Sequence, residues 1–369
     1  LLFLVTEDWY FASHRLPLAR AAVAAGWCVS VATRVRSHGD AIAATGAELI
    51  PIGLRREGIG PFQQATVLAE LVSLYRRLRP AVAHHVAMKP VLYGSFAARI
   101  AGTPKVVNAI AGLGYAFTGD SMRRRLIGAS IRFGMHALLD RPGSITLLQN
   151  EDDRAMLLDR RVVTKARTRI IRGSGVDLAT FAPFPPPIVP LVVLPARMLA
   201  DKGVREFVEA ARTLRHEGSQ ARFALVGGTD PANPSAIGRK ELDSWVGEGV
   251  VEWWDHRSDM SDVLRQASVV CLPSYREGLP KALLEAAAAG RPIVTTDAPG
   301  CRDVVRDGWN GLLVPVGDPI ALASALRRML ADPTESEQMG RRGRERAERE
   351  FDQDAVADAT LALYEEEFA

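Results

Sequence analysis

Residues 181–196 read Phe-Ala-Pro-Phe-Pro-Pro-Pro-Ile-Val-Pro-Leu-Val-Val-Leu-Pro-Ala. The proline-rich first part is incompatible with a helix or a central strand, because proline lacks a backbone N–H and fixes φ, and it favours an extended chain. The apolar run that follows predicts a buried strand. We therefore interpret residues 181–190 as the linker between two domains.

Short apolar runs alternate with helical patterns on both sides of this segment, which is typical of parallel sheets covered by helices on both faces. The sequence thus predicts an α/β protein of two Rossmann-like, doubly wound domains facing a central cleft. The expected domains are 1–180, completed by a C-terminal helix over 353–369, and 181–352. The expected strands are 1–5, 28–32, 48–52, 81–84, 105–110, 144–149 and 168–171, then 191–196, 221–226, 250–254, 268–273, 292–296 and 312–315.

Composition agrees with two soluble domains. The 369 residues exceed what one core usually supports, and 47% are hydrophobic against 24% charged. The three cysteines lie far apart without metal-site spacing, so we expect a reducing compartment. The apolar start is too short for a signal peptide, and no apolar run is long enough to span a bilayer. We therefore expect a cytoplasmic protein.

The charge is unevenly distributed. Residues 1–180 carry a net charge of +11 and the remaining residues −8, although the whole chain is only +3. A basic domain attracts anions, which include nucleic acid, anionic lipid and phosphorylated substrates.

Ligands of doubly wound sheets bind at the carboxyl ends of the strands. Arg197 and Lys202 follow the strand expected at 191–196 and precede a helix, an arrangement that suits a diphosphate. Gly227 and Gly228 follow the next strand, where the backbone can approach a ligand closely. A solvated basic loop and a plain turn are the ordinary alternatives.

A second loop carries carboxylates. Glu277 lies before a predicted helix and Glu285 about two turns into it, so both can accept hydrogen bonds from sugar hydroxyls along one ligand. Such pairs also occur on solvated helix faces. Here the alanine-rich sequence around Glu285 predicts a closely packed helix.

These motifs, together with the sequences at 300–303 and 307–311, resemble the retaining glycosyltransferases of family 4, which have the GT-B fold, over essentially the whole chain. The resemblance implies that Arg197 and Lys202 neutralise a donor diphosphate, Glu277 holds the donor sugar and Glu285 binds the ribose. It implies no metal or other cofactor, and we interpret Asp352-Gln353-Asp354 as a helix cap. Further donor contacts are expected from Gly227, Gly228, Gly278, Leu279 and Lys281, and from Arg257 near the base.

The basic domain is expected to bind the acceptor. Trp9 and Tyr10 suit a sugar ring or a lipid-linked acceptor, and His14 is a candidate catalytic contact; packing and capping are the alternatives. Gly112 and Gly114 lie in a loop that resembles that of members elongating polyprenyl-diphosphate-linked glycans. Arg123, Arg124 and Arg125 precede an apolar stripe and could lie on anionic lipid, with a solvated basic face over a core helix as the alternative.

The expected function is retaining transfer of a hexose or N-acetylhexosamine from a UDP-sugar to a polyprenyl-diphosphate-linked saccharide, in surface polysaccharide or glycan assembly. The protein would then lie peripherally on the inner face of the cell membrane, through its basic domain. The alternatives are a UDP-sugar epimerase on the same fold and a sugar-binding protein without catalysis. Nucleic acid is not an expected partner, because it gives no role to Glu277 and Glu285.

Overall fold

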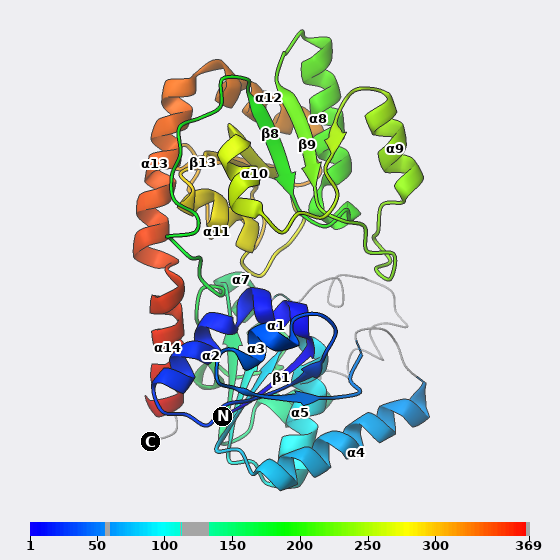
Figure 1. Cartoon of the computed structure of the whole chain (residues 1–369), viewed down its shortest axis with the longest axis vertical. Coiled ribbons are helices and arrows are strands. Elements are labelled where there is room, and N and C mark those ends of the chain that lie inside the picture. Colours follow the sequence, from blue (N-terminus) through cyan, green and yellow to red (C-terminus); the bar gives the residue numbers. More distant parts are fainter. Residues whose placement is uncertain (56–59, 111, 113–132, 367–369) are drawn as a thin grey trace. The chain divides into compact units, whose positions relative to one another are not determined.

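The computed structural model describes residues 1–55, 60–110, 112 and 133–366. The chain divides into two compact units, which Figure 1 shows coloured along the sequence. Unit 1 comprises Leu1–Ser174 and Asp354–Ala369, and unit 2 comprises Gly175–Gln353. Each contains one sheet whose described strands pair in parallel.

The sheet of unit 1 has the order β3-β2-β1-β4-β5-β6-β7 in the described part of the chain. Its strands are β1 Leu2–Glu7, β2 Ser30–Arg34, β3 Glu48–Pro51, β4 Val82–Val86, β5 Lys105–Ala109, β6 Ser144–Leu148 and β7 Thr168–Ile170. Its helices include α1 Asp8–His14, α2 Leu16–Ala24, α3 Gly39–Ala43, α4 Pro61–Leu78, α5 Met88–Ala101, α7 Glu151–Asp159 and α14 Gln353–Glu366, with a short 3₁₀ turn at Lys165–Arg167.

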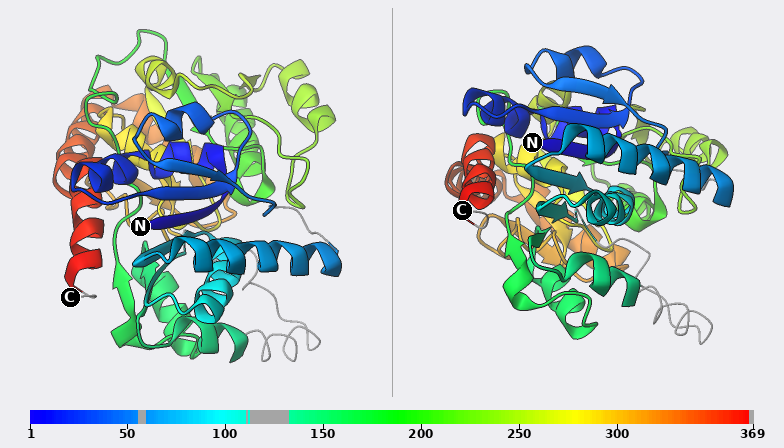
Figure 2. Two further views of the ribbon diagram at one scale, coloured as in Figure 1. Left: turned by 60° about the horizontal axis from the view of Figure 1, so that its bottom comes forward. Right: turned by 90° about the horizontal axis from the view of Figure 1, so that it is seen from below.

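Strand β1 shows why both faces of this sheet are covered. Successive side chains of a strand point to opposite faces. Phe3 and Val5 therefore pack in one cluster with residues of α1, α2 and α14, whereas Leu2 and Leu4 pack in another with residues of α4 and α5. Helices α4 and α5 pack against each other, and the view from below in Figure 2 shows them as neighbours. A strand buried on both faces has a nearly continuous apolar run, as residues 2–5 of β1 do here.

Helix α14 brings the last residues of the chain back to unit 1. Tyr364 is buried, and its hydroxyl forms a hydrogen bond with Nδ1 of His84 on β4. The Tyr364 ring also meets that of Trp27 edge to face, with centroids 6.0 Å apart. Burial raises the pKa of Tyr364 and lowers that of His84, so both are neutral near pH 7. Unit 1 is therefore completed by residues far away in the sequence.

The sheet of unit 2 has the order β10-β9-β8-β11-β12-β13 among the described strands. These are β8 Leu191–Pro195, β9 Arg222–Val226, β10 Glu252–Trp253, β11 Val269–Leu272, β12 Ile293–Thr296 and β13 Gly311–Val314. The helices are α8 Val204–His216, α9 Arg239–Gly247, α10 Met260–Gln266, α11 Lys281–Ala288, α12 Pro319–Ala331 and α13 Pro333–Glu350, with a 3₁₀ turn, η3, at Ala200–Lys202.

In unit 2, the side chains of β8 likewise point alternately to the two faces of the sheet. Val192 and Leu194 of β8 pack with residues of α8 and α12, while Leu191 and Val193 pack with residues of α11 on the other face. A strand lies at or within two residues of each position predicted from the apolar runs. The predicted fold class, two parallel doubly wound α/β domains, is confirmed.

The proline-rich segment 181–190 belongs to unit 2 and is not the connection between the units. Two guanidinium groups of unit 2 bind its carbonyls: Arg291 donates to Pro185 at 3.3 Å and Arg344 to Phe181 at 3.1 Å. The division lies between 174 and 175 instead of the expected 180 and 181. Proline stiffness alone had suggested the later position, whereas these hydrogen bonds tie the segment to unit 2.

Unit 1 offers a test of how tightly the ends of its strands pack. Gly143 has φ +75°, and a Cβ there would lie 2.1 Å from the carbonyl oxygen of Pro104. Gly143→Ala should lower the free energy of unfolding by about 3 kcal/mol, because both the left-handed backbone and the clash oppose alanine. Urea denaturation measures this change.

Gly102→Ala is the matched control. Gly102 has φ +73°, and no atom lies within 4 Å of the position that a Cβ would take there. Only the cost of the left-handed backbone, about 1 kcal/mol, should therefore appear. Equal losses in the two variants would show that the Pro104 contact is not a constraint.

Candidate active site

The candidate site of unit 2 lies at the carboxyl ends of three neighbouring strands. Strand β8 lies between β9 and β11 in the sheet. Because these strands are parallel, the loops that follow them emerge at the same edge. Arg197, Lys202, Gly227, Gly228 and Glu277 occur in these loops.

An ion pair joins the loops after β8 and β11. Nζ of Lys202 lies 2.5 Å from Oε1 of Glu277, and the two side chains are only 17% and 13% exposed. The buried hydroxyl of Ser274 donates to the same oxygen at 2.7 Å. The backbone N–H of Tyr275 donates to the carbonyl of Asp201 at 2.9 Å, which fixes the two loops to each other.

A second ion pair joins the loops after β8 and β9. Nη1 of Arg197 lies 2.5 Å from Oδ2 of Asp230. The site therefore holds two cations, each paired with a carboxylate from a neighbouring loop.

Gly227 explains how the loop after β9 comes so close to that after β8. Its φ is +157°, and a Cβ at this position would lie 1.8 Å from the carbonyl oxygen of Ala196. The next residue, Gly228, accepts a hydrogen bond from the backbone N–H of Met198 at 3.0 Å. The predicted close approach at these glycines is thus an approach of one loop backbone to another.

Helix α11 presents Glu285 in a buried position. Glu285 is 8% exposed, and Nζ of Lys281 lies 3.7 Å from its Oε1. Burial raises the pKa of Glu285 to about 7, although Lys281 acts in the opposite direction. No side chain caps the N-terminus of α11, which follows Gly278 and the buried Leu279. Its backbone amides are oriented to favour an anion or a polar ligand atom there.

The loop after β12 supports Glu277 from its other side. The backbone N–H of Glu277 donates to the carbonyl of Pro299 at 3.0 Å. The buried thiol of Cys301 lies close by, and burial together with the Glu277 charge raises its pKa to about 12, so it stays protonated.

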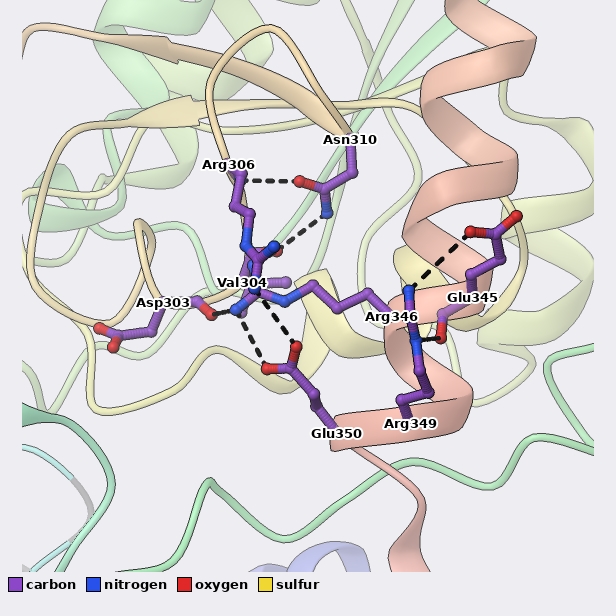
Figure 3. A network of polar contacts seen from close by, with 8 residues as sticks. All are labelled: Asp303, Val304, Arg306, Asn310, Glu345, Arg346, Arg349 and Glu350. Atoms are coloured by element: carbon purple, nitrogen blue, oxygen red, sulfur yellow. Dashed lines mark hydrogen bonds and ion pairs between the residues drawn. The ribbon is translucent and has the colours of Figure 1, made fainter.

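Figure 3 shows how helix α13 holds the continuation of that loop. Arg346 is 5% exposed and donates to the carbonyls of Asp303 at 2.8 Å and Val304 at 3.0 Å. Glu350 is its ionic partner at 3.3 Å. The charge is thereby satisfied within the fold, which assigns Arg346 a structural role.

Arg257, expected near the base, is bound within its own loop. Its Nε donates to Oδ1 of Asp259 at 2.7 Å, and its guanidinium lies 5.9 Å from the ring centroid of Trp254. Hydrogen bonding to Arg257 lowers the pKa of Asp259 to about 2. A role for Arg257 toward a nucleotide remains a proposal.

The expected acceptor residues belong to unit 1. Trp9, Tyr10 and His14 occur on α1, and Trp9 is 39% exposed. The His14 ring stacks on that of Tyr10 with centroids 4.2 Å apart. Gly112 has φ +110°. Gly114, Arg123, Arg124 and Arg125 lie outside the described residues.

Sequence reasoning assigned no role to Ser274, Asp230 or Asp8. Asp8 is fully buried, and its Oδ2 accepts hydrogen bonds from the backbone N–H groups of Arg36, Ser37 and His38 at 2.7–2.8 Å. Burial opposes ionisation, but these bonds lower the pKa of Asp8. Their positions in the sequence could have identified these two aspartates as candidates. Asp8 comes directly after β1, and Asp230 follows soon after the end of β9.

The described residues contain neither a candidate metal site nor a candidate membrane-spanning helix. These residues contain no group of three or more His, Cys, Asp or Glu side chains that could hold a metal ion. In the same part of the chain, no helix is long and apolar enough to cross a membrane.

Two Rossmann-like units, one of which gathers cations and carboxylates at the carboxyl edge of its sheet, have the architecture of the GT-B fold. Family models match both halves of the chain: Glycosyl transferase 4-like over residues 1–136 and Glycosyl transferases group 1 over residues 189–332. The chain belongs to these glycosyltransferases.

Similar curated proteins are bacterial glycosyltransferases. The N,N'-diacetylbacillosaminyl-diphospho-undecaprenol α-1,3-N-acetylgalactosaminyltransferase of Campylobacter jejuni is 26% identical over 334 residues, covering 87% of this chain and 86% of that protein. The putative glycosyltransferase EpsD of Bacillus subtilis is 27% identical over 364 residues, covering 94% and 91%.

Solved structures share the fold. Sucrose-phosphate synthase of Thermosynechococcus elongatus superposes with a TM-score of 0.79 at 22% identity, covering 100% of this chain and 98% of that one. Anabaena HepE in complex with UDP and glucose has a TM-score of 0.75 at 16% identity, covering 98% of each chain.

The buried Glu285 makes stability depend on pH. Because its pKa rises on folding from 4.5 to about 7, its contribution to stability is greatest below pH 4.5 and falls as the pH rises to about 7. Glu285→Gln, which resembles the protonated form, should raise the Tm of the ligand-free protein by about 2–4 °C at pH 8.5 and by less at pH 5. Calorimetry at both pH values checks this; an equal shift at both would contradict an ionised, desolvated Glu285.

Proposed function

We propose that the protein transfers a sugar from a UDP-sugar to a polyprenyl-diphosphate-linked saccharide, with retention of the anomeric configuration, in surface polysaccharide or glycan assembly. The observation that carries the proposal is the pair of cations, Arg197 and Lys202, at one sheet edge, where Lys202 is paired with Glu277. Glu285 is buried on α11, the helix that follows the loop of Glu277. The Campylobacter relative, which acts on a diphospho-undecaprenol acceptor, and the UDP-bound Anabaena structure support it.

The residues of unit 2 fit such a reaction. Arg197 and Lys202 would bind the diphosphate and stabilise the charge that develops on it as its bond to the sugar C1 breaks. Glu277 would accept hydrogen bonds from the donor sugar, and Glu285 from the ribose. The leaving phosphate would take the proton of the acceptor hydroxyl as that oxygen bonds to C1 on the same face. This chemistry requires no metal ion.

Unit 1 is proposed to hold the acceptor, with Trp9, Tyr10 and His14 as contacts. The net charge of +11 over residues 1–180 would favour a lipid diphosphate and an anionic membrane surface. We accordingly propose a peripheral location on the inner face of the cell membrane.

A panel of UDP- and GDP-sugars tests the reaction class. The protein is incubated with each donor, with and without a polyprenyl-diphosphate-linked sugar, and nucleotide release and lipid mass are followed. We expect acceptor-dependent UDP release with a one-sugar gain in lipid mass. Conversion of a UDP-sugar without acceptor would instead identify an epimerase, and binding without turnover a sugar-binding protein.

Two substitutions test the donor site. Lys202→Ala and Glu277→Gln should each lower kcat by about 10²–10³, because each removes a contact to the reacting donor. Steady-state kinetics on the active donor measures this, and circular dichroism reports folding.

Arg222→Ala is the control, since it removes an exposed ion pair with Glu252 in the same unit. It should retain wild-type turnover. Unchanged kcat in folded Lys202→Ala would contradict the donor site.

A further inference from the structure

The ligand-free site neutralises its own cations. Arg197 is paired with Asp230, and Lys202 with Glu277. The four side chains therefore have no net charge, although two of them are expected to bind a diphosphate. Family resemblance gave Glu277 a role toward the sugar, but it gave none to Asp230.

The loop that carries Asp230 is fixed to the loop of Arg197. The backbone N–H of Ala200 donates to Ser235 at 2.8 Å, and that of Ile237 donates to Met198 at 2.9 Å. Leu199 and Ala236 form an antiparallel bridge. These contacts lie on the C-terminal side of Asp230. On its N-terminal side, the backbone of Gly227 lies close to the carbonyl of Ala196.

Asp230 is also held within its own turn. Its carbonyl accepts the backbone N–H of Asn233 at 2.8 Å, and its side chain is 14% exposed. The turn that carries Asp230 thus stays beside the loop of Arg197 when an anion arrives, so the carboxylate can pair with Arg197 again after the anion leaves.

Two effects of Asp230 on diphosphate binding oppose each other. The carboxylate orients Arg197, which reduces the entropy lost on binding. It also adds a negative charge beside a ligand of at least two negative charges, in a partly desolvated place where charge interactions are strengthened. Nη1 of Arg197 donates to Oδ2 of Asp230, and this pairing offsets the positive charge that the diphosphate would otherwise meet, so repulsion outweighs orientation.

Building on the proposed donor site, we propose that Asp230 is an internal competitor of the diphosphate for Arg197. It weakens nucleotide binding and helps product release by pairing with Arg197 again as the nucleotide leaves. The free diphosphate product carries about one more negative charge than the same group esterified to a sugar. Asp230 therefore opposes the product more than the donor, which limits product inhibition.

The test is calorimetric titration of UDP into the full chain. Asp230→Asn keeps the size of the side chain and removes its charge, so it should tighten the Kd of UDP by about tenfold, equivalent to about 1.4 kcal/mol. The dissociation rate of UDP, from stopped-flow displacement, should fall by a similar factor. In the transfer assay, UDP should become a stronger inhibitor.

Asp243→Asn is the matched control, because it removes one exposed carboxylate of α9 in the same unit. It should leave the Kd of UDP within about twofold. Tightening equal to that of Asp230→Asn would show a general charge effect and overturn the proposal. An unchanged or weakened Kd in Asp230→Asn would also overturn it, and weakening would identify Asp230 as an orienting residue. A wild-type protein that binds no UDP would instead contradict the donor site itself.

Discussion

The ion pair between Lys202 and Glu277 is the interaction on which the candidate active-site edge of unit 2 depends. It joins loops that follow neighbouring strands, and Ser274 donates a hydrogen bond to the same carboxylate. Both charges are largely buried, so either one alone would carry a desolvation cost without compensation. The pair therefore fixes the relative position of the two loops before any ligand is present.

The surrounding elements of unit 2 keep that arrangement rigid. In the loop after β12, the carbonyl of Pro299 accepts a hydrogen bond from the backbone N–H of Glu277. Arg346 of α13 donates to two carbonyls further along the same loop. The loop after β9 is locked by its backbone approach at Gly227. Charges that are held in place before a reaction can stabilise a developing negative charge without reorganising, as the proposed transfer from a diphosphate would require.

Unit 1 is organised by long-range contacts. Helix α14 returns to it from the end of the chain, with Tyr364 bonded to the buried His84. The fully buried Asp8 gathers three backbone N–H groups from the loop after β2. In both contacts a buried polar side chain forms hydrogen bonds with partners that are distant in the sequence.

The sequence alone determined the class of fold, because the apolar runs that mark strands buried on both faces are a local property of the chain. It also predicted Arg197, Lys202, Glu277 and Glu285 as candidate site residues, from the loops and the helix that follow strands and from resemblance to a family. Only the tertiary structure revealed that Asp230 and Ser274 bind these residues, and that the chain divides at 174/175 ahead of the proline segment. Such contacts depend on the order of strands in the sheet and on hydrogen bonds between distant residues, neither of which local periodicity encodes.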